Sequence, residues 1–231
     1  MNQPPESPTL ISYLDILHPA LREVSATPAA FQRYLETFRL PVQPRRILLF
    51  SGHMLDAPDR VMPRFPADKV PQATQKIAAV LDKLAVGAED LALTQGACGG
   101  DLLFTVACQQ RGVPVSWLQP FAEGEFIQRS VTRCGADWEA IYHAARAKLT
   151  DAIHAAPAEL GALTAAADDA LPYTRCNLWL LYTALATAGD QTRFVCLWNG
   201  ASGDGQGGTA HMVSEVQRWH GKVDWIDTRE L

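Results

Sequence analysis

Residues 91–120 read LALTQGACGGDLLFTVACQQRGVPVSWLQP, which is the pattern of a complete β-α-β unit. The apolar run at 91–94 predicts a buried strand, a glycine-bearing turn follows it, and a helix extends from there to about Arg111. Gly112 ends that helix, and residues 113–118 predict a second strand. Two strands joined through a helix in this way are parallel, and the crossover between them is right-handed.

The turn of this unit carries Gly96, Gly99, Gly100 and Asp101 at the point where the helix begins. Small residues there leave the backbone N–H groups of Gly99, Gly100 and Asp101 open to an anion, and the helix dipole favours negative charge at the same place. We therefore predict a phosphate site in this turn. The alternative is that a tight turn from strand to helix needs glycine whether or not a ligand is present.

Length and charge narrow the class of protein. The chain has 231 residues, with 20 Lys and Arg against 25 Asp and Glu, for a formal net charge of -5. That length suits one large α/β domain that buries roughly 70% of its unfolded surface. The acidic balance and the lack of a long basic run argue against a partner nucleic acid. The sequence has neither a signal-peptide pattern nor an apolar segment of membrane-spanning length, so we expect a cytoplasmic protein with no membrane partner.

Cysteine and histidine patterns indicate no metal site and no disulfide framework. The five cysteines are odd in number, widely scattered and never form C-x-x-C, which favours buried, reduced thiols. The six histidines do not have metal-ligand spacing. We predict no metal and no cofactor.

Two parts of the chain are predicted to be organised differently, namely an N-terminal helical arm at 1–42 and a Rossmann-like domain at 43–231. Apolar residues recur at helical spacing in the arm, at Leu10, Ile11, Leu14, Leu17 and Leu21. This arm and the apolar helix that is predicted to start at Leu178 offer more hydrophobic surface than one sheet requires. We therefore expect a homodimer or a higher oligomer.

A second unit near the C-terminus repeats the strand, glycine turn, helix and strand order. Residues 193–198 predict a strand, 199–209 a loop with five glycines, 209–220 a helix, and 222–227 a last strand. The alanine-rich stretch 152–170 is interpreted as an insertion or a solvent-facing helix. The predicted fold is α/β, a Rossmann-like three-layer sandwich with a mostly parallel sheet of about five or more strands.

The first strand, RILLFS at 46–51, ends in residues that are placed to meet a ligand, because open parallel sheets bind ligands at the carboxyl ends of their strands. Ser51 and Gly52 end this strand, and His53 follows them. His53 is positioned to hydrogen-bond a ligand, although a single loop histidine is more often solvated. An amphipathic helix is predicted next at 71–84, with Gly87 as its stop.

Three charged residues are candidates for chemistry or charge recognition. Glu123 and Glu125 are two residues apart in a predicted short helix, so at most one of them faces the site. Arg175 precedes a helix start, where a cation is unfavourable unless it meets an anion. The alternative for Arg175 is an ordinary surface arginine.

The order of these motifs resembles the SLOG superfamily of Rossmann-like proteins. The resemblance rests on SGH after the first strand, then GACGGDLLF, LQPFAEGEF, YTRCN, and finally WNG, GGTAHMV and KVDWID. It covers roughly 45–227, without the alanine-rich stretch. The pattern is most similar to the DprA-like and uncharacterised bacterial branch. The superfamily includes DNA-processing Smf/DprA proteins, LOG phosphoribohydrolases and nucleotide-sensing domains, so the resemblance implies a nucleotide-like small-molecule partner.

The chain departs from the LOG pattern at its catalytic motif. LOG enzymes carry P-G-G-x-G-T-x-x-E, which supplies phosphate-binding amides and a catalytic glutamate. Here Gly207, Gly208 and Thr209 take the place of the turn, no glutamate follows three residues later, and Glu215 is one helical turn too far along. Arg175 is the counterpart of the family's arginine. The resemblance therefore favours a nucleotide sensor over a LOG-type N-glycosidase, and a DprA-like DNA-binding protein is the weakest alternative.

The predicted ligand contacts share a position at or near the carboxyl edge of the sheet, with Ser51, Gly52 and Phe121 lining the sugar or base and the two glycine turns holding phosphate. They are Ser51, Gly52, His53, Gly96, Gly99, Gly100, Asp101, Phe121, Arg175, Asn177, Gly207, Gly208 and Thr209. If the protein is an enzyme, the acids that would assist water are Asp101, Glu123 or Glu125.

Overall fold

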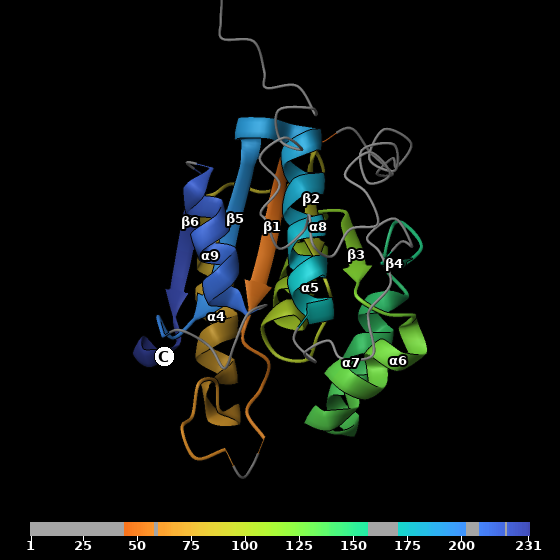
Figure 1. The fold of residues 1–231 in the computed structure, drawn as a ribbon, viewed down its shortest axis with the longest axis vertical. Coiled ribbons are helices and arrows are strands. Elements are labelled where there is room, and N and C mark those ends of the chain that lie inside the picture. Colours follow the sequence, from red (N-terminus) through yellow and green to blue (C-terminus); the bar gives the residue numbers. More distant parts are fainter. Residues whose placement is uncertain (1–43, 58–59, 157–170, 202–207, 220) are drawn as a thin grey trace, which may run out of the picture.

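The computed structural model of the protein describes residues 44–57, 60–156, 171–201, 208–219 and 221–231. Its centre is one parallel sheet of six strands in the order β4-β3-β2-β1-β5-β6 (Figure 1). The strands are β1 (Arg46–Gly52), β2 (Asp90–Thr94), β3 (Val115–Gln119), β4 (His154–Ala155), β5 (Thr192–Trp198) and β6 (Lys222–Asp227). The four central strands are short, mostly apolar runs, as expected for strands that are covered on both faces.

Helices lie on both faces of the sheet. They are α4 (Val70–Lys83), α5 (Gly100–Gln110), α6 (Glu123–Ser130), α7 (Ala136–Arg146), α8 (Leu171–Ala188) and α9 (Thr209–Arg218). Leu48 and Phe50 of β1 pack in one core with α4 and α5, whereas Ile47 and Leu49 pack in the other with α8 and α9. This alternation is the two-residue period of a strand. The three layers are visible in Figure 1 and confirm the predicted Rossmann-like α/β fold.

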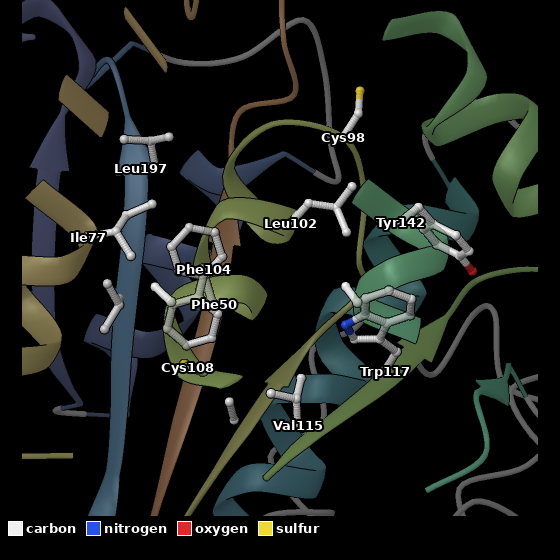
Figure 2. Close-up of a cluster of buried hydrophobic side chains, with 14 of the residues drawn as sticks. Phe50, Ile77, Cys98, Leu102, Phe104, Cys108, Val115, Trp117, Tyr142 and Leu197 are labelled. Atoms are coloured by element: carbon white, nitrogen blue, oxygen red, sulfur yellow. The ribbon is translucent and has the colours of Figure 1, made fainter. Parts of the chain in front are cut away.

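Aromatic side chains fill the core on the α4 and α5 side, which Figure 2 shows. The rings of Phe50 and Phe104 stack with centroids 4.4 Å apart, and those of Trp117 and Tyr142 lie 4.8 Å apart. Trp117 is fully buried, and its indole Nε1 donates a hydrogen bond to Thr105 Oγ1 at 3.1 Å. The one polar atom of that large side chain is therefore satisfied inside the core.

A buried carboxylate fixes the register of β1 and β2 at the amino edge of the sheet. Asp90 pairs in register with Arg46 and is fully buried. Its Oδ2 accepts from Arg46 at 2.8 Å and from Arg45 at 3.1 Å. Removing either partner leaves a buried charge with less compensation, so this cluster specifies the pairing strongly.

Several boundaries differ from the predictions. The helix predicted after residue 177 begins at Leu171, so YTRCN lies inside α8 rather than before it. His154 and Ala155 form the edge strand β4, in a segment interpreted as an insertion or helix. Helix α4 ends at Lys83, and Ala85 takes a φ of 48°, so the chain turns before it reaches Gly87. Short polar or alanine-rich segments carry little local signal, and tertiary contacts decide them.

The prediction of five reduced thiols is wrong for one pair. Cys98 and Cys134 form a disulfide, with Cα atoms 6.4 Å apart. Cys108, Cys176 and Cys196 are free and buried, as predicted. Cys98 and Cys134 are 36 residues apart in the sequence. Spacing alone does not show which segments meet in the fold, so the sequence did not predict this disulfide.

Other predictions fall on residues that the structure does not describe. These are the helical arm at 1–42, positions 157–170 of the alanine-rich stretch, and Gly207. In the described ranges, none of the helices has the length and hydrophobicity that crossing a bilayer requires. The same ranges contain no group of three or more His, Cys, Asp or Glu side chains arranged to hold a metal ion.

Candidate functional site

The strand order reverses direction at β1. From β1 the chain adds β2, β3 and β4 on one side, and it then returns to place β5 and β6 on the other. Ligands of open parallel sheets bind outside the carboxyl ends of the strands at such a switch point. The carboxyl ends here are Gly52 of β1 and Trp198 of β5, which are neighbouring strands.

Helix α9 begins beside the carboxyl end of β1, at this reversal. Its N-cap is Gly208, in an extended conformation, and its first residue is the buried Thr209. The Oγ1 of Thr209 lies 3.3 Å from the Oγ of Ser51, at the end of β1. The two hydroxyl groups therefore lie together at the N-terminus of a helix, a position that favours an anion.

His53 joins three segments at the switch point. Its N–H donates to Leu197 O at 2.9 Å, and its carbonyl accepts from Gly100 N–H at 3.0 Å. Its ring Nε2 lies 3.1 Å from Asn199 Oδ1 and 3.2 Å from Asn199 N. The side chain is buried, so His53 is not a solvated loop histidine. Its Nε2 contacts Asn199 and is therefore not left for a ligand.

The charge of His53 follows from this burial. Desolvation lowers the pKa of His53 to about 4; the Asn199 hydrogen bond opposes that change, and Arg64 and Arg60 add to it. The imidazole is therefore neutral at neutral pH. The two arginines belong to the loop after β1, and Asp56 of the same loop opposes their effect on the pKa of His53 and forms an ion pair with Arg60 at 3.4 Å.

The glycines of the β2–α5 turn are explained by packing between backbones. A Cβ on Gly100 would lie 3.1 Å from Gly52 Cα, and one on Gly99 would lie 2.8 Å from Leu55 N, where φ is also +88°. The Gly100 N–H is bonded to His53 O, so the prediction that it is free for phosphate is wrong. The alternative that the turn needs glycine for its own geometry holds at these two positions.

Asp101 stabilises the same turn from inside. Its carboxylate Oδ2 accepts a hydrogen bond from Ala97 N–H at 3.3 Å, and the residue is buried. Burial raises the pKa of Asp101 to about 6, and nearby amides, first that of Ala97, oppose this rise. A carboxyl group with this pKa changes charge just below neutral pH. Gly96 in the same turn faces the Trp117 ring, which a Cβ would approach to 2.8 Å.

The first turns of α8 extend the site toward β3. Arg175 is buried at 6% exposure, and desolvation lowers the pKa of its guanidinium. Asn177 Oδ1 accepts from Gln95 Nε2 at 2.7 Å, which ties α8 to the end of β2. Phe121 is also buried, and its ring meets the Tyr173 ring edge-on with centroids 5.6 Å apart.

Glu123 and Glu125 are both paired with arginines. Glu123 forms an ion pair with Arg146 and accepts from Tyr142 OH at 3.3 Å. The Arg146 hydrogen bond holds the pKa of Glu123 below its ordinary value. Glu125 is exposed and pairs with Arg129 at 3.0 Å. The lowered pKa of Glu123 does not suit a general acid near neutral pH.

The structure thus brings most of the predicted contacts to one edge, from β5 across β1 and β2 to β3. Sequence reasoning missed Asn199 and Gln95, which hold His53 and Asn177 in place. Both residues directly follow a strand, and this position was the available signal for them. Asn199 stands at the start of a glycine-rich loop, and the glycines are the stronger signal in that segment of the sequence.

No protein-family model matches the chain, and no curated protein matches it either. The function is therefore inferred from the carboxyl edge of the sheet itself.

Proposed function

We propose that the protein binds a phosphorylated nucleoside or a related nucleotide at the carboxyl edge of its sheet and acts as a ligand sensor. The observation that carries this proposal is the reversal of strand order between β1 and β5, with α9 starting beside Ser51. The motif order similar to SLOG proteins is consistent with it, and we propose membership of that superfamily on the same grounds.

The phosphate is assigned to the start of α9 rather than to the β2–α5 turn. Gly99 and Gly100 are accounted for by backbone contacts, but a Cβ on Gly208 meets nothing within 4 Å among the described atoms. Gly208 has a φ of -85°, which any residue can adopt, so the fold does not require glycine there. A glycine without a packing reason at the N-terminus of a helix supports close approach of a phosphate.

The rest of the ligand would extend along the edge toward α8. Arg175 adds a cation in the first turns of that helix, and Phe121 and Tyr173 form an aromatic pair beyond it. A nucleotide would match a cation followed by aromatic side chains, since it carries an anionic phosphate at one end and a planar base at the other.

The ion pairing of the candidate catalytic carboxylates favours a sensor over a hydrolase. Glu123 and Glu125 are held as ion pairs, and no glutamate lies three residues after Thr209. One observation supports the alternative, an N-glycosidase of LOG type. The pKa of Asp101 is raised to about 6, close to the value that a general acid or base requires near neutral pH.

A nucleotide screen by thermal shift, with chromatography of each mixture, tests the proposal. We expect at least one nucleotide to raise the melting temperature and to be recovered intact. Free base that is released by wild-type protein, and lost in Asp101→Asn with binding preserved, would instead establish the enzyme.

Matched variants locate the site. Thr209→Val removes a hydroxyl at the start of α9, and Gly208→Val places a side chain where phosphate is proposed. Thr187→Val is the control, because Thr187 is an exposed threonine near the far end of α8. We expect the first two to weaken binding about tenfold or more and the control to leave it unchanged. Unchanged affinity in folded Gly208→Val would remove α9 from the site.

A further inference from the structure

We infer that Cys98 and Cys134 form a reversible redox link, which sets how tightly the turn before α5 is held to the segment between α6 and α7. Asp101, in the first turn of α5, accepts a hydrogen bond from this turn, and the turn packs against the backbone of His53, so the link borders the candidate site. The inference does not depend on nucleotide binding.

The two sulfurs connect separate parts of the fold. Cys98 lies in the turn between β2 and α5, and Cys134 ends the short helix η2 (Thr132–Cys134) that follows α6. A backbone hydrogen bond from Cys98 N–H to Ser130 O, 2.8 Å long, supports the same contact. When the disulfide opens, that hydrogen bond still keeps the two thiols near each other, so the bond can form again.

The two cysteines differ in exposure. Cys98 is fully buried, whereas Cys134 is half-buried. We therefore assign the attack of an external thiolate to Cys134. The other three thiols are buried, and burial raises the pKa of each, to about 12 for Cys196. They remain protonated and do not compete as nucleophiles.

The exchange needs a low-molecular-weight monothiol such as glutathione as the reductant. Its thiolate attacks Cys134 Sγ, the bond between Cys134 and Cys98 breaks, and Cys98 leaves as a thiolate that takes up a proton. A second thiolate then attacks the small-molecule sulfur of the mixed disulfide. This step releases Cys134 as a thiolate, which is protonated, and forms the small disulfide. Two electrons pass to the protein, and the reverse sequence with the small disulfide as oxidant restores the bond.

Opening the bond loosens the turn. The disulfide closes a loop across a separation of 36 residues, and its loss returns conformational freedom to the unfolded chain and to the turn itself. Gly96 and Gly99 both have positive φ, so this turn consists partly of residues with high intrinsic freedom. The bond from Ala97 N–H to Asp101 and that from Gly100 N–H to His53 O remain.

The test is a titration of the full chain in glutathione buffers of graded redox ratio. Each sample is quenched with an alkylating reagent and mapped by mass spectrometry, and hydrogen exchange is measured on the two end states. We expect Cys98 and Cys134 to titrate together, and Cys108, Cys176 and Cys196 to be labelled only after denaturation. Reduction should raise amide exchange at 95–99 and 130–134 at least about tenfold and lower the melting temperature by about 5 to 15 °C.

A double variant, Cys98→Ala with Cys134→Ser, serves as the control. It should show the exchange rates of the reduced form at every redox ratio. A disulfide that excess dithiol cannot open in the native protein would make it purely structural and overturn the inference. Equal exchange at 95–99 in oxidised and reduced wild-type protein would also overturn it, because the link would then control nothing. If the double variant does not fold, the wild-type titration still decides between these outcomes.

Discussion

His53 and Asn199 stand 146 residues apart in the sequence and contact each other across the end of the sheet, with His53 Nε2 3.1 Å from Asn199 Oδ1. The same Oδ1 accepts from Ala201 N–H at 3.1 Å, so it also shapes the start of the β5–α9 loop. The pair joins the loops after the two strands that flank the switch point. It therefore sets the spacing between the carboxyl ends of β1 and β5, where we place the ligand.

Asn199→Ala removes the side-chain amide, which lies beside the His53 ring and accepts from Ala201 N–H at 3.1 Å. We expect the free energy of unfolding to fall by about 1 to 3 kcal/mol, measured by urea denaturation. Ser214→Ala removes an exposed hydroxyl that bonds to a carbonyl of its own helix, α9, and should stay within about 0.5 kcal/mol of wild type. Equal stability of the two variants would mean that the pair contributes nothing.

The pH dependence of stability should contain two opposing contributions. The folded-state pKa of His53 is lowered from 6.5 to about 4, so its contribution is present above 6.5 and lost as the pH falls through 4. The folded-state pKa of Asp101 is raised from 3.8 to about 6, so its contribution is present below 3.8 and lost as the pH rises through 6. Each difference corresponds to roughly 3 kcal/mol, and the two largely offset each other between pH 4 and 6.5.

Single variants separate these contributions in denaturation curves between pH 4 and 7. Asp101→Asn leaves only the contribution of His53 to the pH dependence, so this variant should lose stability as the pH falls. His53→Gln leaves only the contribution of Asp101, so that variant should gain stability as the pH falls over the same range. Parallel curves for the two variants would show that neither group carries the assigned pKa shift.

Gly100→Ala should destabilise the fold itself, because the new Cβ would approach Gly52 Cα to 3.1 Å and His53 O to 3.3 Å. We expect a loss of about 1 to 3 kcal/mol on thermal or urea unfolding. Gly124→Ala is the matched control in the first turn of α6, where a Cβ meets nothing within 4 Å of the described residues. It should be neutral or stabilise by up to about 1 kcal/mol. Two variants of equal stability would contradict the close approach of the two backbones.

Arg175→Ala should weaken binding of the nucleotide that the thermal-shift screen identifies. A charge-assisted hydrogen bond to phosphate is worth about 1.5 to 3 kcal/mol, which corresponds to roughly a tenfold to hundredfold loss of affinity by calorimetry. Arg218→Ala, at an exposed arginine at the end of α9, controls for net charge and should bind normally. A folded Arg175→Ala protein with wild-type affinity would exclude Arg175 from the site.

Local sequence patterns were sufficient for the layered fold. The segments at 91–93 and 194–198 are apolar without a break, and each is followed by a glycine turn and a helical segment. Such strands must be covered on both faces, and strands joined through helices must be parallel. These constraints act between neighbours in the chain, so the sequence contains them directly. They also place Ser51 and Thr209 at the carboxyl edge, because each lies where a strand ends or a helix begins.

Contacts between distant segments could only be seen in the folded protein. Cys98 meets Cys134, Gly100 lies against Gly52, and His53 meets Asn199 because the sheet order brings their loops together. The turn before α5 looked like a phosphate site in the sequence, since glycine beside a helix start has the same appearance whether it admits a ligand or another backbone. Packing distinguishes the two cases: Gly99 and Gly100 are required by neighbouring backbone atoms, whereas Gly208 is not.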